Sequence, residues 1–115
     1  MSGADHAKTI ASNDRSLQVI YAISPEVIPA NEPFTIAVQV VGLDSETVSD
    51  LVLSIDAGMP EHGHGMNVEP TVTSLGHNMF RVDNMLFHMA GRWELYFDIT
   101  RDGVTSRAQD EITLQ

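Results

Sequence analysis

Side chains that can bind a soft metal ion are concentrated in one part of this 115-residue chain. Apart from Met1, the chain has ten histidine and methionine residues, and nine of them lie between residues 59 and 89. Even scattering would place about three of the ten in that window. The nine are Met59, His62, His64, Met66, His77, Met79, Met85, His88 and Met89. Because thioether sulfur favours Cu(I) over Zn²⁺, Mg²⁺ or Ca²⁺, the cluster predicts copper(I) chemistry.

The first of two motifs in this window alternates ligand and glycine. His62, His64 and Met66 stand at every second position, so in an extended segment they project to the same side. Gly63 and Gly65 between them let the backbone bend. Two imidazoles and a thioether could therefore converge on one ion.

The second motif follows about twenty residues later and reads MLFHMAG over residues 85–91. It adds one imidazole and two thioethers to the candidate ligands. Glu61, beside the first histidine pair, is a candidate acceptor that would orient an imidazole through a hydrogen bond. The predicted metal ligands are His62, His64, Met66, Met85, His88 and Met89.

Each candidate also has a structural interpretation. Methionine fills irregular gaps in cores, so Met85 and Met89 could pack beside Trp93. Met59, at the end of a predicted strand, is better explained by packing than by metal binding. His88 could be a hydrogen-bonded structural histidine. The HGHG loop has little apolar bulk to pack, which makes a metal role harder to dismiss there.

Alternation of apolar and polar residues with period two predicts an all-β chain. We expect an antiparallel β-sandwich of immunoglobulin-like or cupredoxin-like type with about seven strands, or alternatively a small open barrel. The sandwich would span residues 16–115 as a single domain, and the polar residues 1–15 would form a disordered arm. The expected strands are 16–22, 34–40, 50–57, 68–74, 79–85, 93–99 and 105–114.

Strands that run up and down in turn would divide the candidate ligands between the two ends of the sandwich. The loops 58–67 and 86–91 should then share one end, and the turn 75–78 should lie at the other, roughly 20 Å away. His77 and Met79 are accordingly predicted to be surface residues, separated from the remaining candidates.

Composition excludes several classes of function. Without cysteine the chain has no disulfide, thiolate zinc site, iron–sulfur cluster or blue copper centre. A net charge of −10 opposes binding to nucleic acid or to anionic membrane surfaces. No apolar run is long enough to insert into a membrane. The chain has no nucleophile elbow, phosphate-binding loop or HExxH motif, so we expect no catalysis.

The two motifs together resemble the YtkA-like/FixH-like family of small extracytoplasmic β-sandwich domains. A Met-Pro loop rich in glycine and histidine is followed by a Phe-x-Met-x-Gly-x-Trp stretch, and the resemblance covers roughly residues 16–114. It implies an immunoglobulin-like fold, export or membrane tethering, and an association with copper handling or oxidase assembly. The matching residues are Met59, Pro60, His62, Gly63, His64, Gly65, Met66, Phe87, Met89, Gly91 and Trp93.

The preferred hypothesis is a soluble periplasmic or otherwise extracytoplasmic Cu(I)-binding protein that chaperones or stores copper. Its signal or anchor would have been removed, and a copper-receiving protein or a membrane protein would be its partner. One alternative is a non-catalytic accessory or interaction domain whose HGHG loop is structural. Another is a Zn(II) or Cu(II) site made from His62, His64 and His88 alone.

Overall fold

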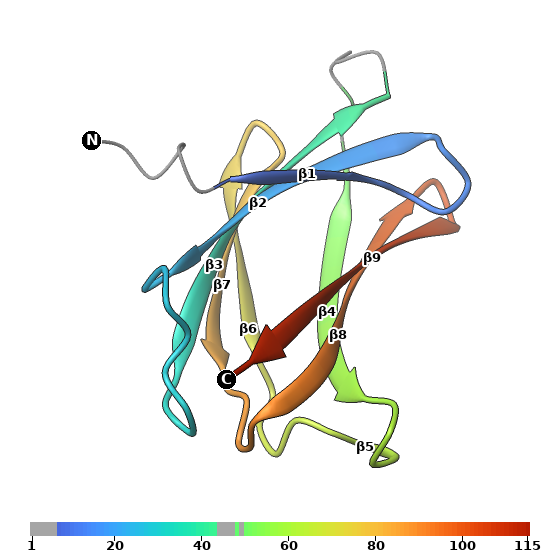
Figure 1. The fold of residues 1–115 in the computed structure, drawn as a ribbon. Helices are drawn as coiled ribbons and strands as arrows, with labels where there is room; N and C mark the ends of the chain where they lie inside the picture. Colours follow the sequence, from blue (N-terminus) through green and yellow to red (C-terminus); the bar gives the residue numbers. More distant parts are fainter. Residues whose placement is uncertain (1–6, 44–47, 49) are drawn as a thin grey trace.

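The chain is described by a computed structural model over residues 7–43, 48 and 50–115. The described residues form nine strands in two packed antiparallel sheets (Figure 1), which confirms the predicted antiparallel sandwich. The seven predicted strands are present, and β1 and β5 are additional. The strands are β1 (Lys8–Ala11), β2 (Leu17–Ser24), β3 (Phe34–Gly42), β4 (Val52–Met59), β5 (His64–Gly65), β6 (Thr71–Gly76), β7 (Met79–Met85), β8 (Gly91–Arg101) and β9 (Val104–Leu114).

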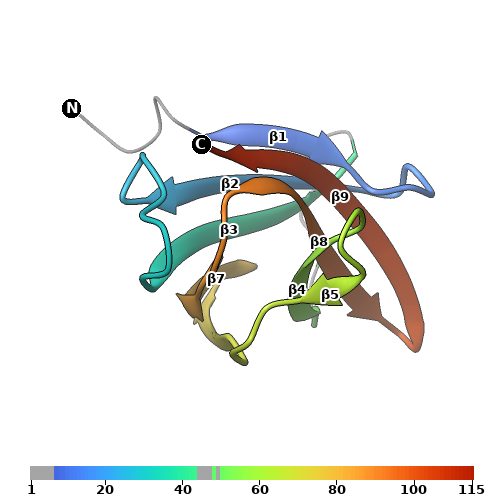
Figure 2. The same cartoon turned by 60° about the horizontal axis from the view of Figure 1, so that its bottom comes forward.

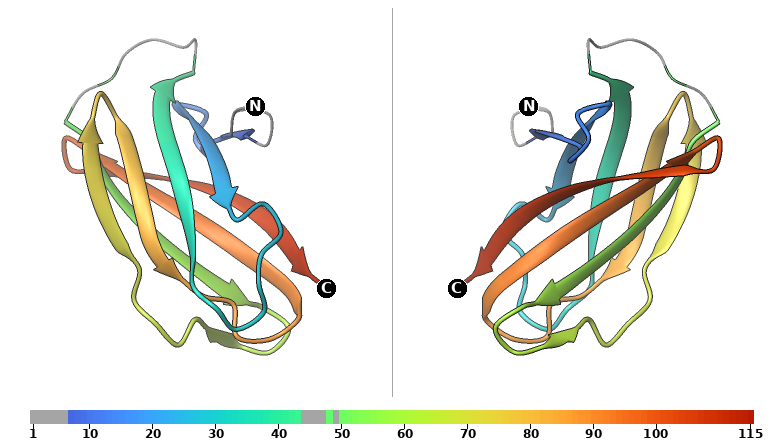
Figure 3. Two further views of the ribbon diagram at one scale, coloured as in Figure 1. Left: turned by 90° about the vertical axis from the view of Figure 1, so that its left-hand side faces the viewer. Right: turned by 90° about the vertical axis from the view of Figure 1, so that its right-hand side faces the viewer.

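The two sheets have different strand orders. One sheet has five strands in the order β1-β2-β3-β7-β6, and the other has four in the order β5-β4-β8-β9. Figure 3 shows the two layers from opposite sides. Within the described part of the chain, no helix is long and apolar enough to cross a membrane.

The core lies between the sheets and follows the period-two pattern of the sequence. β2, β3, β4 and β8 turn alternate side chains inward, because successive residues of a strand face opposite sides. Tyr21 of β2 meets Phe97 of β8 across the interface, with ring centroids 5.0 Å apart. Burial of each such side chain contributes about 1.5–3 kcal/mol. On β8 the fully buried residues are Trp93, Leu95, Phe97 and Ile99.

The prediction of a disordered arm over residues 1–15 is wrong for the part that begins at β1. β1 pairs antiparallel with β2 over all four of its residues, and Ser12 just after it forms a bridge to β9. Asp14 in the following turn accepts hydrogen bonds from Ser12 at 2.7 Å and from Ser106 of β9 at 2.6 Å. The long-range contacts with β9, the Ser12 bridge and the Ser106 hydrogen bond, fix a segment whose local sequence is polar and aperiodic. Residues 1–6 of the expected arm lie outside the described residues.

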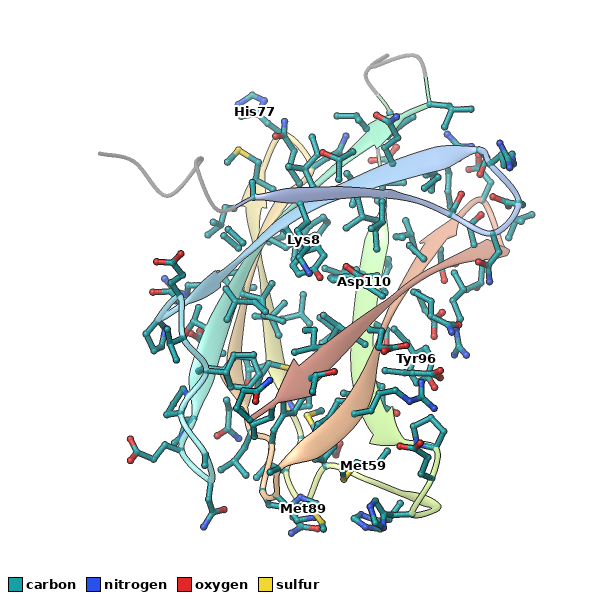
Figure 4. The ribbon with its side chains drawn as sticks, in the orientation of Figure 1. Lys8, Met59, His77, Met89, Tyr96 and Asp110 are labelled. Atoms are coloured by element: carbon teal, nitrogen blue, oxygen red, sulfur yellow. The ribbon has the colours of Figure 1, made fainter. Side chains whose placement is uncertain are left out.

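The loops that carry most of the candidate ligands meet at one end of the sandwich, here named the histidine end. It is formed by the β2–β3 loop, the β4–β5 hairpin and the β7–β8 connection (Figures 1 and 3). The backbone N–H of Asn31 donates to the carbonyl of Phe87 at 2.9 Å and joins two of these segments. Figure 4 places Met59 and Met89 at the histidine end and His77 at the opposite end. The predicted division between the two ends is confirmed.

Candidate metal centre

The HGHG segment is a tight hairpin rather than the extended loop that the alternation predicted. β5 folds back on β4, with Met59 opposite His64 in the register. The carbonyl of Met59 accepts hydrogen bonds from the N–H groups of His62 at 3.1 Å and Gly63 at 3.0 Å. Gly63 has φ = 68°, a left-handed conformation that glycine adopts without steric cost. The turn, not strand alternation, therefore sets the direction of His62.

The β7–β8 connection, which carries the third histidine, is held on the core by Trp93. Phe87 stacks on the Trp93 ring with centroids 4.4 Å apart and an interplanar angle of 6°. The indole N–H donates to the carbonyl of Met89 at 3.0 Å. His88 lies between these two anchors and meets Trp93 edge to face at 5.4 Å.

The three histidines form a row across the two loops. The ring centroids of His62 and His64 are 5.8 Å apart, and those of His64 and His88 are 5.2 Å apart. Two imidazoles on one tetrahedral ion, each with a metal–nitrogen bond of about 2.0–2.1 Å, have centroids about 5 Å apart. The His64–His88 spacing is close to that value, and the His62–His64 spacing is somewhat longer. Figure 2, with the histidine end brought forward, shows the hairpin of β4 and β5 that carries two of these rings.

The donor atoms of the described histidines do not surround a single point. Among the residues that the structure describes, no group of three or more His, Cys, Asp or Glu is arranged to hold a metal ion. His62 and His64 are exposed, whereas His88 is half-buried.

One polar atom of the row has no hydrogen-bond partner in the described part of the chain. Nδ1 of His88 is buried and makes no hydrogen bond with any described residue. A buried polar group without a partner costs about 1–3 kcal/mol. A hydrogen-bond partner or a metal ion at this nitrogen would remove that cost, so the chemistry of the site suits a ligand.

The methionines divide into rim and core residues. Met66 is half-buried against the core and Met89 is 36% exposed, both in segments of the histidine end. Met59 and Met85 are buried core residues, 1% and 0% exposed. Met85 lies opposite Phe34 in the β3–β7 register. The structure thus brings His62, His64 and His88 together, leaves Met66 and Met89 in the flanking segments, and packs Met85 in the core.

Glu61 forms an ion pair with an arginine. The sequence had suggested instead that it accepts a hydrogen bond from a histidine. Its carboxylate lies 3.6 Å from Nε of Arg92. The Arg92 guanidinium also pairs with Glu94 at 3.2 Å and Glu111 at 3.3 Å. The hydrogen bond to Glu94 is the main cause that raises the pKa of Arg92. The hydroxyl of Tyr96 is the main cause that lowers the pKa of Glu94.

Three consecutive residues at the start of β8 support the site, although they are not metal-ligand types and the sequence did not assign them to it. Gly91 has φ = 132°, and a Cβ there would lie 2.6 Å from Cε of Met59. Arg92 holds Glu61, and Trp93 holds the β7–β8 connection. Gly91 and Trp93 belong to the second sequence motif, but nothing in the local sequence marks Arg92.

Comparisons with known proteins identify the family. A family model described as YtkA-like matches residues 14–98. The crystal structure of a DUF4426 family protein from Pseudomonas aeruginosa PAO1 aligns with a TM-score of 0.58. The alignment covers 96% of this chain and 98% of that one at 12% sequence identity, a likeness that shows the fold alone. No curated protein matches the chain. Neither description names a reaction or a metal.

Proposed function

Given that the chain belongs to the YtkA-like family, we propose that it binds copper(I) at the histidine end and chaperones or stores it without catalysis. The observation that carries the proposal is the row His62, His64 and His88, in which two loops distant in sequence place neighbouring imidazole rings with centroids 5.8 and 5.2 Å apart. The buried, unpartnered Nδ1 of His88 supports it.

The choice of copper(I) depends on the methionines that flank the row. Met89 is exposed and Met66 half-buried in the same loops, and thioether sulfur is a soft ligand that selects Cu(I). No thiolate is available, because the chain has no cysteine. A site of imidazole and thioether ligands is suited to carrying the ion rather than to blue-copper electron transfer.

Exposure of the site supports transfer of the ion to a partner. His62 and His64 lie in the solvent-facing hairpin, where a second protein could replace them one ligand at a time. We propose that the protein acts outside the cytoplasm, and that its partner is a copper-receiving or membrane protein. Nucleic acid is not among the proposed partners, because the net charge of −10 opposes phosphate.

A second candidate is a Zn(II) or Cu(II) site made of the three histidines alone. The spacing of the imidazole rings favours it as much as it favours Cu(I), because nitrogen ligands suit all three ions. The two candidates differ in whether sulfur contributes to affinity.

The test is an anaerobic Cu(I) titration against a competing chelator. The parent should bind one ion, and the His62→Ala/His64→Ala double variant and the His88→Ala variant should each bind at least about tenfold more weakly. His77→Ala, at the opposite end of the sandwich, is the matched control and should bind like the parent. Equal affinity of the parent and the double variant would refute the proposal.

A further inference from the structure

We infer that the first three residues of β8, Gly91-Arg92-Trp93, form a clamp that fixes the two histidine-bearing segments relative to each other. Within it, Arg92 and Trp93 are positioning residues for the metal site. The expected effect of the clamp on metal affinity rests on the proposed function. The clamp itself is a property of the metal-free protein.

Two members of the clamp hold the β4–β5 hairpin. At Gly91 the missing side chain leaves room for Met59, the last residue of β4, whose methyl group fills that space. Arg92 reaches the turn of the hairpin through its ion pair with Glu61, the residue immediately before His62. The base and the turn of the hairpin are therefore both attached to the start of β8.

The third member holds the other segment. Trp93 is fully buried and supports the β7–β8 connection on both sides of His88, by stacking on Phe87 and by its hydrogen bond to the carbonyl of Met89. The Trp93 ring also contacts His88 directly. One strand thus anchors the histidine pair of the hairpin and the single histidine of the connection.

The clamp can be rigid because β8 is central to its sheet. β8 pairs with β4 on one side and with β9 on the other, and its pairing with β9 begins at Gly91. Trp93 turns into the core while Arg92, one residue earlier, faces outward, as alternation along a strand requires. Ligands held in place before binding lose less conformational freedom on binding.

Replacing Arg92 with glutamine distinguishes a positioning role from a purely electrostatic effect on Cu(I) affinity. Removing a positive charge near a cation site reduces repulsion, so electrostatics alone predicts tighter Cu(I) binding in Arg92→Gln. Loss of the tie to Glu61 predicts the opposite, weaker binding by about threefold, the effect expected when an exposed ion pair is lost. Arg92→Lys, which keeps the charge and one possible ion pair, should recover part of the affinity. Arg81→Gln on β7, whose partner is Asp83, is the matched control for the change in charge.

A metal-free measurement tests the clamp even where the proposed function fails. The rings of His64 and His88, 5.2 Å apart, should give nuclear Overhauser effects between their imidazole protons in the apoprotein. In Arg92→Gln these effects should weaken or vanish, and in Arg81→Gln they should persist. Persistence in Arg92→Gln overturns the inference, as does Cu(I) binding in that variant as tight as in the parent or tighter. A parent that binds no Cu(I) refutes the proposed function alone, and the Overhauser effects then decide on the clamp.

Discussion

The methyl group of Met59 occupies the position that a side chain on Gly91 would need: a Cβ on Gly91 would lie 2.6 Å from Cε of Met59. Met59 is buried and cannot move into solvent without opening the core. The contact joins the end of β4 to the start of β8 at the point where the two histidine-bearing segments meet.

Gly91→Ala should therefore destabilise the protein. The new methyl group would be strained by φ = 132° and would displace Met59, which together should lower the free energy of unfolding by about 1–3 kcal/mol. Urea denaturation measures this change. Gly103→Ala is the control, because Gly103 also has a positive φ of 79°, but a Cβ there would have no described atom within 4 Å. An equal cost in both variants would contradict the contact with Met59.

Trp93→Phe should loosen the β7–β8 connection. The variant loses the hydrogen bond to the carbonyl of Met89 and leaves a small cavity, and the free energy of unfolding should fall by about 2–3 kcal/mol. Hydrogen exchange should be faster at the Asn31 amide, which donates to the carbonyl of Phe87 in this connection. Tyr96→Phe, which removes a hydroxyl from the outer face of β8, should leave exchange of that amide unchanged. Unchanged protection of the Asn31 amide in Trp93→Phe would exclude the anchoring role.

The methionine substitutions distinguish copper(I) from the histidine-only site. Met66→Leu/Met89→Leu should weaken Cu(I) binding by at least about tenfold if thioethers are ligands, and should leave Zn²⁺ affinity unchanged. Met85→Leu is the matched control, because Met85 is buried in the core and this swap conserves volume. Competition titrations with each ion give the answer. Equal loss of affinity in Met85→Leu would return Met85 to the ligand set.

Acid should weaken the link between the β1–β2 turn and β9. Hydrogen bonds from Ser106 and Ser12 are the largest causes that hold the pKa of Asp14 far below its usual range. A carboxyl whose pKa is lower in the folded than in the unfolded state stabilises the fold above its unfolded pKa of about 3.9, and this stabilisation is lost as the pH falls toward the folded pKa. Below pH 4 the parent should lose more thermal stability than Asp14→Asn, which has no such group. Parallel melting temperatures of the two proteins in this range would contradict the assignment.

The sequence predicted the strands that show apolar–polar alternation and missed β1 and β5, which form through pairing with other strands. Alternation is visible in β8, where Trp93, Leu95 and Phe97 all face the core. β5 is only two residues long, too short for a period, and forms because the turn at Gly63 returns the chain to β4. β1 is polar and is fixed by contacts with β2 and β9.

For the site, strand direction was enough to group the loops at one end, but not to predict the contacts within that end. The proximity of His62 and His64 was expected from an extended segment and arises from a turn. The ion pair of Glu61 with Arg92 joins residues 31 positions apart and depends on how the hairpin docks on β8. No local pattern encodes such a contact.

The edge-to-face contact between His88 and Trp93 gives the molecule an optical reporter of its own. Trp93 is the only tryptophan in the chain, and its ring centroid lies 5.4 Å from that of His88. An ion bound at His88 would change the surroundings of the sole indole and hence its fluorescence. If the proposed function holds, ion binding at the histidine end could be followed through this fluorescence in unlabelled protein.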